Sequence, residues 1–207
     1  METVMTRVSA GFAVLMSLVA ATVALAQQPP GVRVRGTIEA VDGSTLDVKS
    51  RDGTMVKVKL TDNVVVVGIV PIKIDDIKLN SYIGVTAMPQ ADGSQRAIAV
   101  HIFPEAQRGA AEGFSPWDLR PNSTMTNATV AETVAGTDGQ NILVKYKDGE
   151  KKVVVPPDTP VVTFAPGDRS ELKPGAKILI FRAVKKDDDT LEANRVNVGR
   201  DGIAPPM

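Results

Sequence analysis

The sequence predicts an all-β protein made of two small barrels in tandem, and three observations lead to this prediction. Apolar residues alternate with polar ones in the runs 46–50 and 55–60, and alternation with a period of two is typical of a strand with one buried face. Asp52-Gly53 separates these runs, and Asp-Gly favours the type I′ turn of a β-hairpin. The arrangement returns around Asp148-Gly149, which indicates an internal duplication.

The first half, residues 31–103, is expected to form one barrel module. Its opening strand contains Gly36, where we expect a bulge that lets a small barrel bend. The run 64–70 is apolar on both sides and ends at Pro71, as in a strand covered on both faces. Residues 74–79 are long enough for a single helical turn. The expected strands are 32–41, 46–50, 54–60, 64–70, 82–88 and 95–103.

The second half, residues 125–199, repeats this order as a second module. Thr129-Val130 aligns with Thr37-Ile38, and the segment ending at Gly175 aligns with the segment ending at Asn80. One position disagrees, because Lys152 stands where Val56 is expected to be buried. The third strand of the second half is therefore expected to be shifted by one residue, which would exchange its two faces.

Three strands in a meander, a connecting turn and two further strands resemble the five-stranded OB-type barrel, with a sixth short strand as an option. A module of this size has a small core and gains stability by packing on a neighbour. The connector, residues 104–124, holds the only tryptophan, Trp117, and is expected to be ordered against the barrels. Residues 200–207 form a C-terminal tail.

The N-terminus predicts export. Residues 11–21 form a short apolar run after Arg7, and Ala24-Leu25-Ala26 is followed by polar Gln27, which is typical of a signal peptide spanning residues 1–26. An uncleaved anchor is the competing interpretation, although the run is shorter than the ~20 residues of a spanning helix. We expect a periplasmic or secreted protein with no transmembrane span after cleavage. The sequence has no cysteine, so disulfides and thiol chemistry are excluded.

The charge balance argues against nucleic acid as a partner. The chain has 24 basic and 24 acidic residues, so it has no general attraction to polyanions. The lysines that flank the second Asp-Gly hairpin have no aromatic stacking platform beside them, because Tyr146 lies on the inward parity of its strand. We expect an unknown protein or a small ligand of the cell envelope as the partner, and no cofactor.

The polar residues do not form a catalytic set. The Asp-Gly acids are explained by turn chemistry, which makes a hydrolase the least favoured of the three classes of function. His101 is the sole histidine, and the alternation of its strand turns it outward, to the surface. The weak metal-ligand candidates are His101 and the acidic cluster Asp187, Asp188 and Asp189. A metal-handling accessory protein that uses them is the alternative function.

The duplicated pattern Val-x-Gly-Thr-Ile, Asp-Gly, Asp-Ile-Lys-Leu and Ala-Ile-Ala-Val resembles a family of exported bacterial β-barrel domains of unknown function. Pro116-Trp117-Asp118-Leu119 and the ending Pro205-Pro206-Met207 resemble its two-module alphaproteobacterial branch. The resemblance covers the whole mature chain and implies no catalytic residues. That branch often carries the label of a metal transporter permease. The sequence contradicts this label, because a permease needs several spanning helices.

The sequence therefore predicts a non-enzymatic exported protein that binds a partner or a ligand. The expected binding surface is the joint between the modules, where a lone tryptophan stands among charged residues, as interfaces favour. Its residues are Arg108, Trp117, Asp118, Arg120 and Asn127. The alternative is that Trp117 simply fills the core between the two modules.

Overall fold

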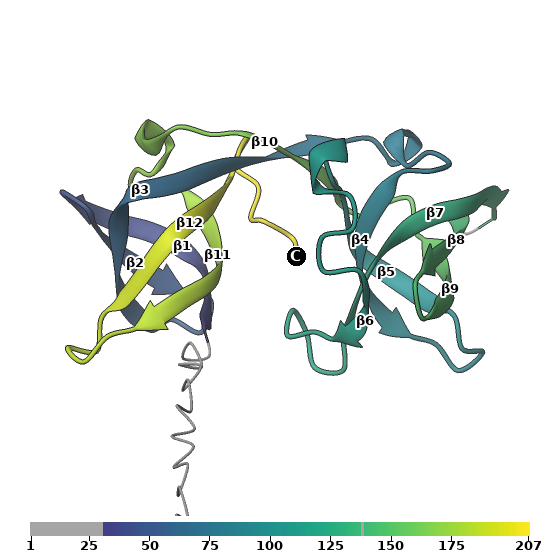
Figure 1. Ribbon diagram of the computed structural model, residues 1–207, viewed down its shortest axis with the longest axis horizontal. Coiled ribbons are helices and arrows are strands. Elements are labelled where there is room, and N and C mark those ends of the chain that lie inside the picture. Colours follow the sequence, from purple (N-terminus) through teal and green to yellow (C-terminus); the bar gives the residue numbers. More distant parts are fainter. Residues whose placement is uncertain (1–30, 138) are drawn as a thin grey trace, which may run out of the picture.

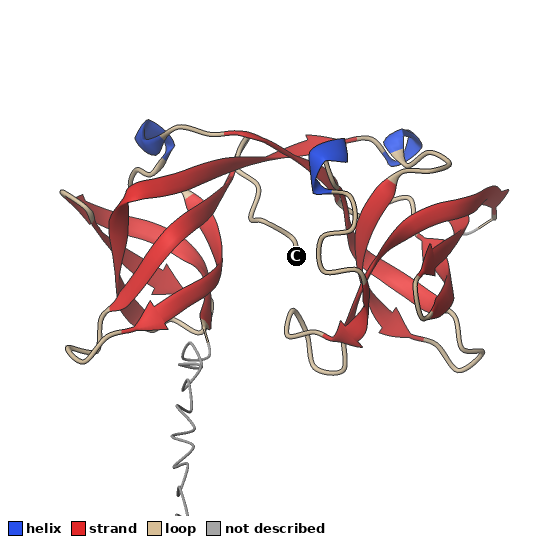
Figure 2. Cartoon of the chain, in the orientation of Figure 1, coloured by secondary structure: helices blue, strands red, loops and turns tan. Residues whose placement is uncertain are grey.

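The computed structural model describes residues 31–137 and 139–207, so the predicted signal peptide, residues 1–26, and Asp138 lie outside the described residues. The all-β prediction is confirmed, since strands dominate the described chain (Figure 2). The strands are β1 (Val32–Asp42), β2 (Thr45–Ser50), β3 (Met55–Ile72), β4 (Tyr82–Pro89), β5 (Gln95–Ile102), β6 (Gly113–Pro116), β7 (Thr124–Gly136), β8 (Gly139–Tyr146), β9 (Gly149–Val155), β10 (Val161–Pro166), β11 (Lys177–Lys185) and β12 (Leu191–Gly199).

The helical structure in the described ranges consists of short 3₁₀ turns, η1 (Ile74–Asp76), η2 (Glu105–Gln107) and η3 (Arg169–Glu171). No helix within these ranges has the length and apolar character needed to cross a membrane.

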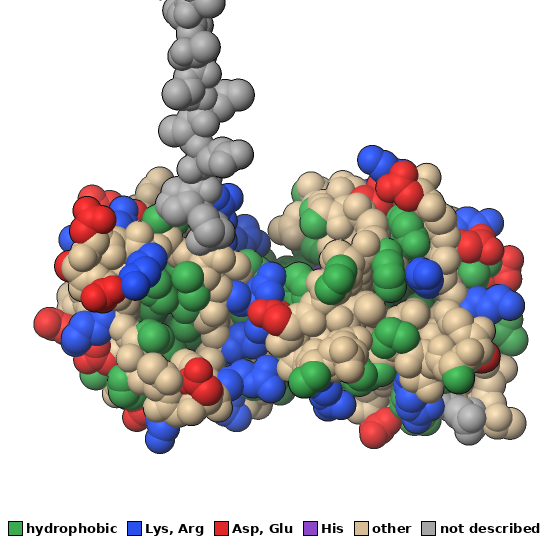
Figure 3. All heavy atoms as spheres, turned by 90° about the horizontal axis from the view of Figure 1, so that it is seen from below, with side chains coloured by type: hydrophobic (Ala, Val, Ile, Leu, Met, Phe, Trp, Pro, Cys, Tyr) green, Lys and Arg blue, Asp and Glu red, His purple; other side chains and the backbone are tan. Residues whose placement is uncertain are grey.

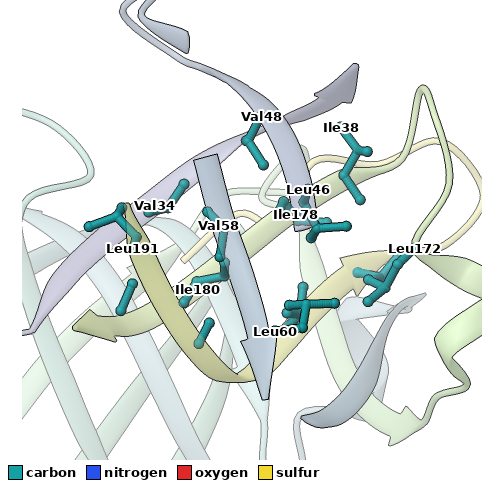
Figure 4. Packing of buried hydrophobic residues seen from close by; sticks show 14 of the residues in the cluster. Val34, Ile38, Leu46, Val48, Val58, Leu60, Leu172, Ile178, Ile180 and Leu191 are labelled. Carbon is teal, nitrogen blue, oxygen red and sulfur yellow. The ribbon is translucent and has the colours of Figure 1, made fainter. Parts of the chain in front are cut away.

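Five strands close a first barrel, which we call barrel 1. β1 pairs with β2, β2 with β3, β3 with β12, β12 with β11, and β11 with β1, and the β3–β12 pair is parallel. Aliphatic side chains from all five strands fill its interior (Figure 4). Each fully buried Leu or Ile stabilises the fold by about 1.5–3 kcal/mol. The core includes Val34, Ile38, Leu46, Val48, Val58, Leu60, Ile178, Ile180, Ala193 and Val196.

Five other strands close barrel 2, with the same order and sense of pairing. β7 pairs with β8, β8 with β9, β9 with β5, β5 with β4, and β4 with β7, and here the β9–β5 pair is parallel. Its core is again aliphatic and includes Ile83, Val85, Val100, Ala128, Val130, Ile142, Val144, Val153 and Val155.

Each barrel draws its strands from both halves of the chain. Barrel 1 joins β1–β3 of the first half to β11 and β12 of the second, and barrel 2 joins β4 and β5 to β7–β9. The barrels therefore do not coincide with the contiguous modules 31–103 and 125–199 that the sequence predicts. Figure 1 shows the two lobes and the crossing: the distal part of β3 carries the chain from barrel 1 to barrel 2, and β10 carries it back.

The crossing follows from the length of β3. This strand continues through Asp62-Asn63 for 18 residues. The prediction that 64–70 is covered on both faces holds for Val66–Ile69, which is buried, but not for Val65, which is 50% exposed. In the second half Pro156, Pro157 and Pro160 separate β9 from β10, because proline cannot donate to a ladder and breaks a strand. β10 then lies antiparallel to β3 and, for three residues, parallel to β5.

The predicted shift in the third strand is confirmed. Leu46 pairs with buried Val58 in barrel 1, whereas its counterpart Ile142 pairs with buried Val153, not Val154. The second hairpin is one residue shorter at its tip, since Tyr146 pairs directly with Gly149. That deletion leaves Lys151 and Lys152 outside the buried set of barrel 2.

The hairpins form at the predicted places, but the turn type differs from the prediction. Gly53 has a φ of 89° and donates to the carbonyl of Ser50, while Asp52 keeps a negative φ. The Asp52 carboxylate instead accepts hydrogen bonds from Thr54 N (2.9 Å) and Ser50 Oγ (2.6 Å). A type I′ turn needs positive φ at both central residues, so the Asp serves as a side-chain acceptor while the Gly supplies the backbone freedom.

The predicted bulge in the opening strand also lies elsewhere. The register of β1 against β2 shifts between Ile38 and Ala40, and that of β7 against β8 shifts between Val130 and Glu132. Gly36 serves a different purpose, because a Cβ there would lie 2.3 Å from the carbonyl oxygen of Lys49. The glycine therefore permits close approach of two strands.

A third apolar cluster joins the two barrels. It combines residues of the crossing strands with residues of β7, β11 and the C-terminal tail, and Met207 is 1% exposed. The connector is ordered as expected: β6 pairs with β7, and Ser123 Oγ lies 3.1 Å from the carbonyl oxygen of Trp117. The cluster contains Ile69, Met125, Val162, Leu179 and Met207, with Trp117, Phe164, Phe181 and Ile203 packed against it.

Candidate functional site

The joint between the barrels contains a cavity of about 350 Å³. It is lined from barrel 2 by β5 and β7, from barrel 1 by β11 and β12, and from the joint by β10 and the connector. Aromatic rings form much of its wall, although the chain has few aromatic residues. The lining rings are His101, Phe103, Trp117, Phe164 and Phe181.

One cross-strand row of barrel 2 creates the room for the polar part of this wall. His101 on β5 and Asn127 on β7 both pair with Gly84 on β4. A Cβ at Gly84 would lie 2.0 Å from His101 Cε1 and 2.6 Å from Asn127 Oδ1. Because the glycine has no side chain, the imidazole of His101 and the amide of Asn127 both occupy the space above its backbone.

His101 is buried, which corrects the expectation of a surface histidine. The parity prediction places it on the outer side of its strand, but that side faces the joint, and the residue is 4% exposed. The rings of Phe103 and Phe164 meet the imidazole edge to face, at centroid distances of 4.6 and 5.5 Å. Burial lowers the pKa of His101 to about 3, so the imidazole is neutral at physiological pH.

Three polar atoms of the lining residues are buried without a hydrogen-bond partner among the described residues: Trp117 Nε1, Asn127 Oδ1 and Asn197 Oδ1. The amide nitrogens of the two asparagines are engaged, since Asn127 Nδ2 donates to Ala111 O at 3.0 Å and Asn197 Nδ2 donates to Leu179 O at 2.9 Å. One donor and two acceptors of the lining residues are therefore left without a partner in this part of the chain.

Arg195 on β12 adds a positive charge to the lining. It is half-buried, and the described residues offer it no side-chain hydrogen bond or ion pair. The lining includes no aspartate or glutamate. Because cations with few neighbouring acids favour negative ligand groups, the cavity suits a molecule that is mostly apolar and carries an acceptor or an anionic group.

The predicted binding residues do not form a single surface. Trp117 and Asn127 line the cavity, whereas Arg120 lines a separate groove between the barrels. Arg108 is committed to barrel 2: its guanidinium binds the Glu105 carboxylate, with Nη2–Oε2 at 2.7 Å, and donates to Asn80 O at 2.8 Å.

Asp118 holds the connector on barrel 1. Its carboxylate forms ion pairs with Arg33 (2.6 Å) and Arg35 (2.8 Å), and the Arg33 guanidinium lies 4.0 Å from the centre of the Trp117 ring. Trp117 thus contributes both to the joint between the barrels and to the cavity wall. Its packing against the third apolar cluster is what the core-plug interpretation expects, and its place in the cavity wall is what the binding interpretation expects.

The weak metal candidates are not brought together. Asp188 accepts from Thr190 N and Oγ1, and Asp189 pairs with Lys185 at 2.7 Å at the β11–β12 hairpin tip. Nowhere in residues 31–137 and 139–207 do three His, Asp or Glu side chains gather closely enough to share a metal ion.

No protein-family model matches the chain, and neither a curated protein nor a solved structure does. The residues that sequence reasoning missed are those of the second half, above all Phe164, Phe181, Arg195 and Asn197. The alignment of Asn197 with His101 is the one sequence signal that could have pointed to them, because both are polar side chains on the outer side of a closing strand.

Replacing Asp118 by Asn should lower the free energy of unfolding by about 1 kcal/mol at neutral pH, a small effect because the carboxylate is half exposed and screened. Burial alone would raise the pKa of Asp118, but the hydrogen bonds from Arg35 and Arg33 outweigh it and hold the pKa well below 3.8. The stabilisation is therefore present above pH 3.8 and is lost as the pH falls below it. Urea denaturation of both proteins at neutral pH and near pH 3 measures it, and an equal difference at both would contradict this assignment.

Proposed function

We propose that the protein is an exported, non-enzymatic binding protein that holds a small, largely apolar ligand between two OB-like barrels. One observation supports this most strongly: the residues that line the aromatic cavity at the joint carry three buried polar atoms, Trp117 Nε1, Asn127 Oδ1 and Asn197 Oδ1, with no partner among the described residues.

A ligand site explains this cavity better than a defect in the packing between the barrels does. Protein interiors are close-packed, and an unpartnered buried donor or acceptor costs about 1–3 kcal/mol. Ligand pockets begin at about 300 Å³ and combine apolar walls with a few polar groups. The cavity, at about 350 Å³ with five rings and three free polar atoms, has this composition.

The lining limits the chemistry of the ligand. A flat ring system suits a wall formed by Phe103, Phe164 and Phe181, because aromatic rings stack or meet edge to face at 4.5–7 Å. An N–H or O–H group would donate to the asparagine oxygens, and Trp117 Nε1 would donate to an acceptor. The charge of Arg195 favours a carboxylate or a similar anionic group.

Binding rather than acid–base catalysis is favoured by the titratable groups present. His101 and Arg195 are the titratable residues of the lining. A general base is most effective with a pKa near the working pH, whereas the pKa of His101 is about 3. His101 is best regarded as a neutral polar ring of the wall.

Internal duplication is supported by matched details in the two barrels. Asn80 donates its backbone N–H to Val130 O, and Gly175 donates its own to Ile38 O, at 2.9 and 2.8 Å. Both donors have positive φ, 66° and 86°. We infer that a five-stranded OB-like unit was duplicated and that the two copies exchanged their last two strands. The signal-peptide pattern of residues 1–26 supports the periplasm or the extracellular space as its location.

Titration with 8-anilino-1-naphthalenesulfonate tests the proposal, because this probe has two ring systems, an N–H donor and an anionic group. Trp117 is the only tryptophan, so its emission reports directly on the cavity. We expect saturable quenching with a dissociation constant on the order of 10 µM.

Two variants at Ser115, an exposed residue of the cavity lining, control for location. Ser115→Phe should obstruct the cavity and weaken binding at least tenfold, whereas Ser115→Ala leaves it open and should bind as the wild type does. Quenching that is unsaturable, or equal in both variants, would count against the proposed function.

A further inference from the structure

A groove of about 580 Å³ lies between the barrels and is distinct from the aromatic cavity, with which it shares no lining residue. Five of its lining residues are cationic and none is acidic. Figure 3 shows Lys and Arg side chains gathered along the gap between the two lobes, on the side of barrel 1. The cationic residues of the groove are Arg35, Lys49, Arg51, Arg120 and Lys177.

The pairing of three strands brings four of these cations to one face of barrel 1. Thr37 on β1 pairs with Lys49 on β2 and with Lys177 on β11. One step along the same face, Arg51 N donates to Arg35 O at 3.0 Å, so these two arginines are also neighbours. Like charges directly opposite each other on adjacent strands destabilise a sheet, so a bound anion would stabilise this arrangement.

The fifth cation comes from the connector. Arg120 belongs to a tight turn that Ser123 stabilises: the Arg120 backbone N–H donates to Ser123 Oγ at 3.1 Å, and Asn122 has a φ of 63°. The turn directly follows Trp117 and Asp118, which contact Arg33 and Arg35 of β1. Arg120 is thereby placed at the groove although it is distant in sequence from the other four.

Most of these charges are not neutralised by the protein. Arg35 pairs with Asp118, and Lys177 Nζ donates to the neutral carbonyl of Gly202 at 2.9 Å. Across the described residues, the side chains of Lys49, Arg51 and Arg120 have no hydrogen bond or ion pair. The chain as a whole is electrically balanced, so the concentration of one sign in a concave site is a local feature. Concave sites also focus the electric field.

We propose that this groove binds a ligand carrying two or more phosphoryl groups. Several cations spaced along one groove can bind a multivalent anion at several points, whereas a small monovalent ion would contact only one or two of them. Guanidinium and ammonium groups are the usual partners of phosphoryl oxygens, and the Thr37 hydroxyl lies between two lysines as a neutral donor. No aromatic residue lines the groove, so base stacking of a nucleic acid is not favoured.

Calorimetric titration of the purified protein with sodium tripolyphosphate tests this. We expect a single saturable site whose affinity falls several-fold as NaCl rises from about 50 to about 300 mM, because salt screens such contacts. The double variant Lys49→Gln/Arg51→Gln should weaken binding at least tenfold. Both residues are exposed and without partners, so the fold should be unchanged.

The matched control is Lys78→Gln/Arg96→Gln, which removes the same charge from exposed positions outside the groove. It should retain the wild-type affinity to within about twofold. A second arm replaces tripolyphosphate by vesicles of anionic phospholipid. If only vesicle binding depends on Lys49 and Arg51, the phosphoryl source is a lipid headgroup. If neither probe binds, or if both double variants lose the same affinity, the proposal is wrong.

Discussion

Cysteines introduced at Thr37 and Lys177 should form a disulfide within one chain and raise the free energy of unfolding by about 2–4 kcal/mol. These residues are paired on β1 and β11, although they stand near opposite ends of the described chain. A bridge between them closes a loop of about 140 residues, and the stabilisation from restricting the unfolded chain grows with loop length.

The chain suits this experiment because it has no cysteine of its own. Thr37 is partly exposed and Lys177 is exposed, so neither substitution opens a cavity in a barrel core. Non-reducing electrophoresis of the monomer shows whether the bridge forms, and urea denaturation with and without a reductant gives the change in stability.

A second pair of cysteines serves as a control, because its bridge does not depend on which half supplies the last two strands of the barrel. Thr37 also pairs with Lys49 on the neighbouring strand β2, and a bridge between these two forms whether or not the halves exchange strands. Its loop is short, so it should stabilise the protein less. Contiguous barrels would leave Thr37 and Lys177 in different barrels. In that case the Thr37–Lys177 bridge would be absent from the monomer while the Thr37–Lys49 bridge still formed.

The local structure could be predicted because its signals are local. The alternation around Leu46 and Val48 selects the buried face of β2, and the misfit of Lys152 indicates the shifted third strand from the sequence alone. The Asp-Gly pairs predict where the hairpins turn. They do not predict the turn type, because the same dipeptide suits an Asp whose side chain accepts hydrogen bonds from the backbone and an Asp whose backbone has positive φ.

The proposed exchange of strands could not be predicted because the two halves offer equivalent partners. The edge of β1 accepts β11 in the same way as the edge of β7 accepts β4, so a strand from either half satisfies the same pattern. The choice depends on whether β3 bends or continues at Asp62-Asn63. Neither residue forbids an extended conformation, and the interruption by Pro156 and Pro157 occurs in the other half.

The candidate site was only partly predictable for the same reason. Trp117 and Asn127 stand out in the connector region, but the residues opposite them, Phe181 and Asn197, reach the joint only through the exchange. The cationic groove depends on it as well, since Lys177 joins Lys49 through the β1–β11 pairing. His101 shows a related limit. Strand alternation predicts on which side of β5 its side chain lies, but not that the joint buries that side.

Acid should destabilise the protein through His101, with a loss of about 2 kcal/mol between pH 7.5 and pH 5. Burial among apolar rings lowers the pKa of His101 from 6.5 to about 3. Between these two values the unfolded chain binds a proton that the folded protein excludes, so stability falls by up to about 1.4 kcal/mol for each pH unit. The full stability is present above pH 6.5, and the loss continues towards pH 3.

The pH window isolates this residue. His101 is the only histidine, and aspartate and glutamate side chains ordinarily titrate below about pH 5. The contribution of Asp118 to stability declines only below pH 3.8, because its pKa in the folded protein lies well below that value. No charged group contributes to the shift at His101, which is caused by burial, so salt should change the slope little.

Guanidinium denaturation at pH 7.5, 6 and 5 measures the slope for the wild type and for His101→Asn. Asparagine is the residue at the aligned position, Asn197, where it donates to a strand carbonyl, so the replacement keeps a polar side chain on the outer side of the strand. We expect the variant to have a lower stability at pH 7.5, because a smaller side chain leaves space in the joint, and to lose little more down to pH 5. A wild type whose stability is constant over this range would mean that His101 is accessible to protons in the folded state, and the burial of His101 among apolar rings would then be incorrect.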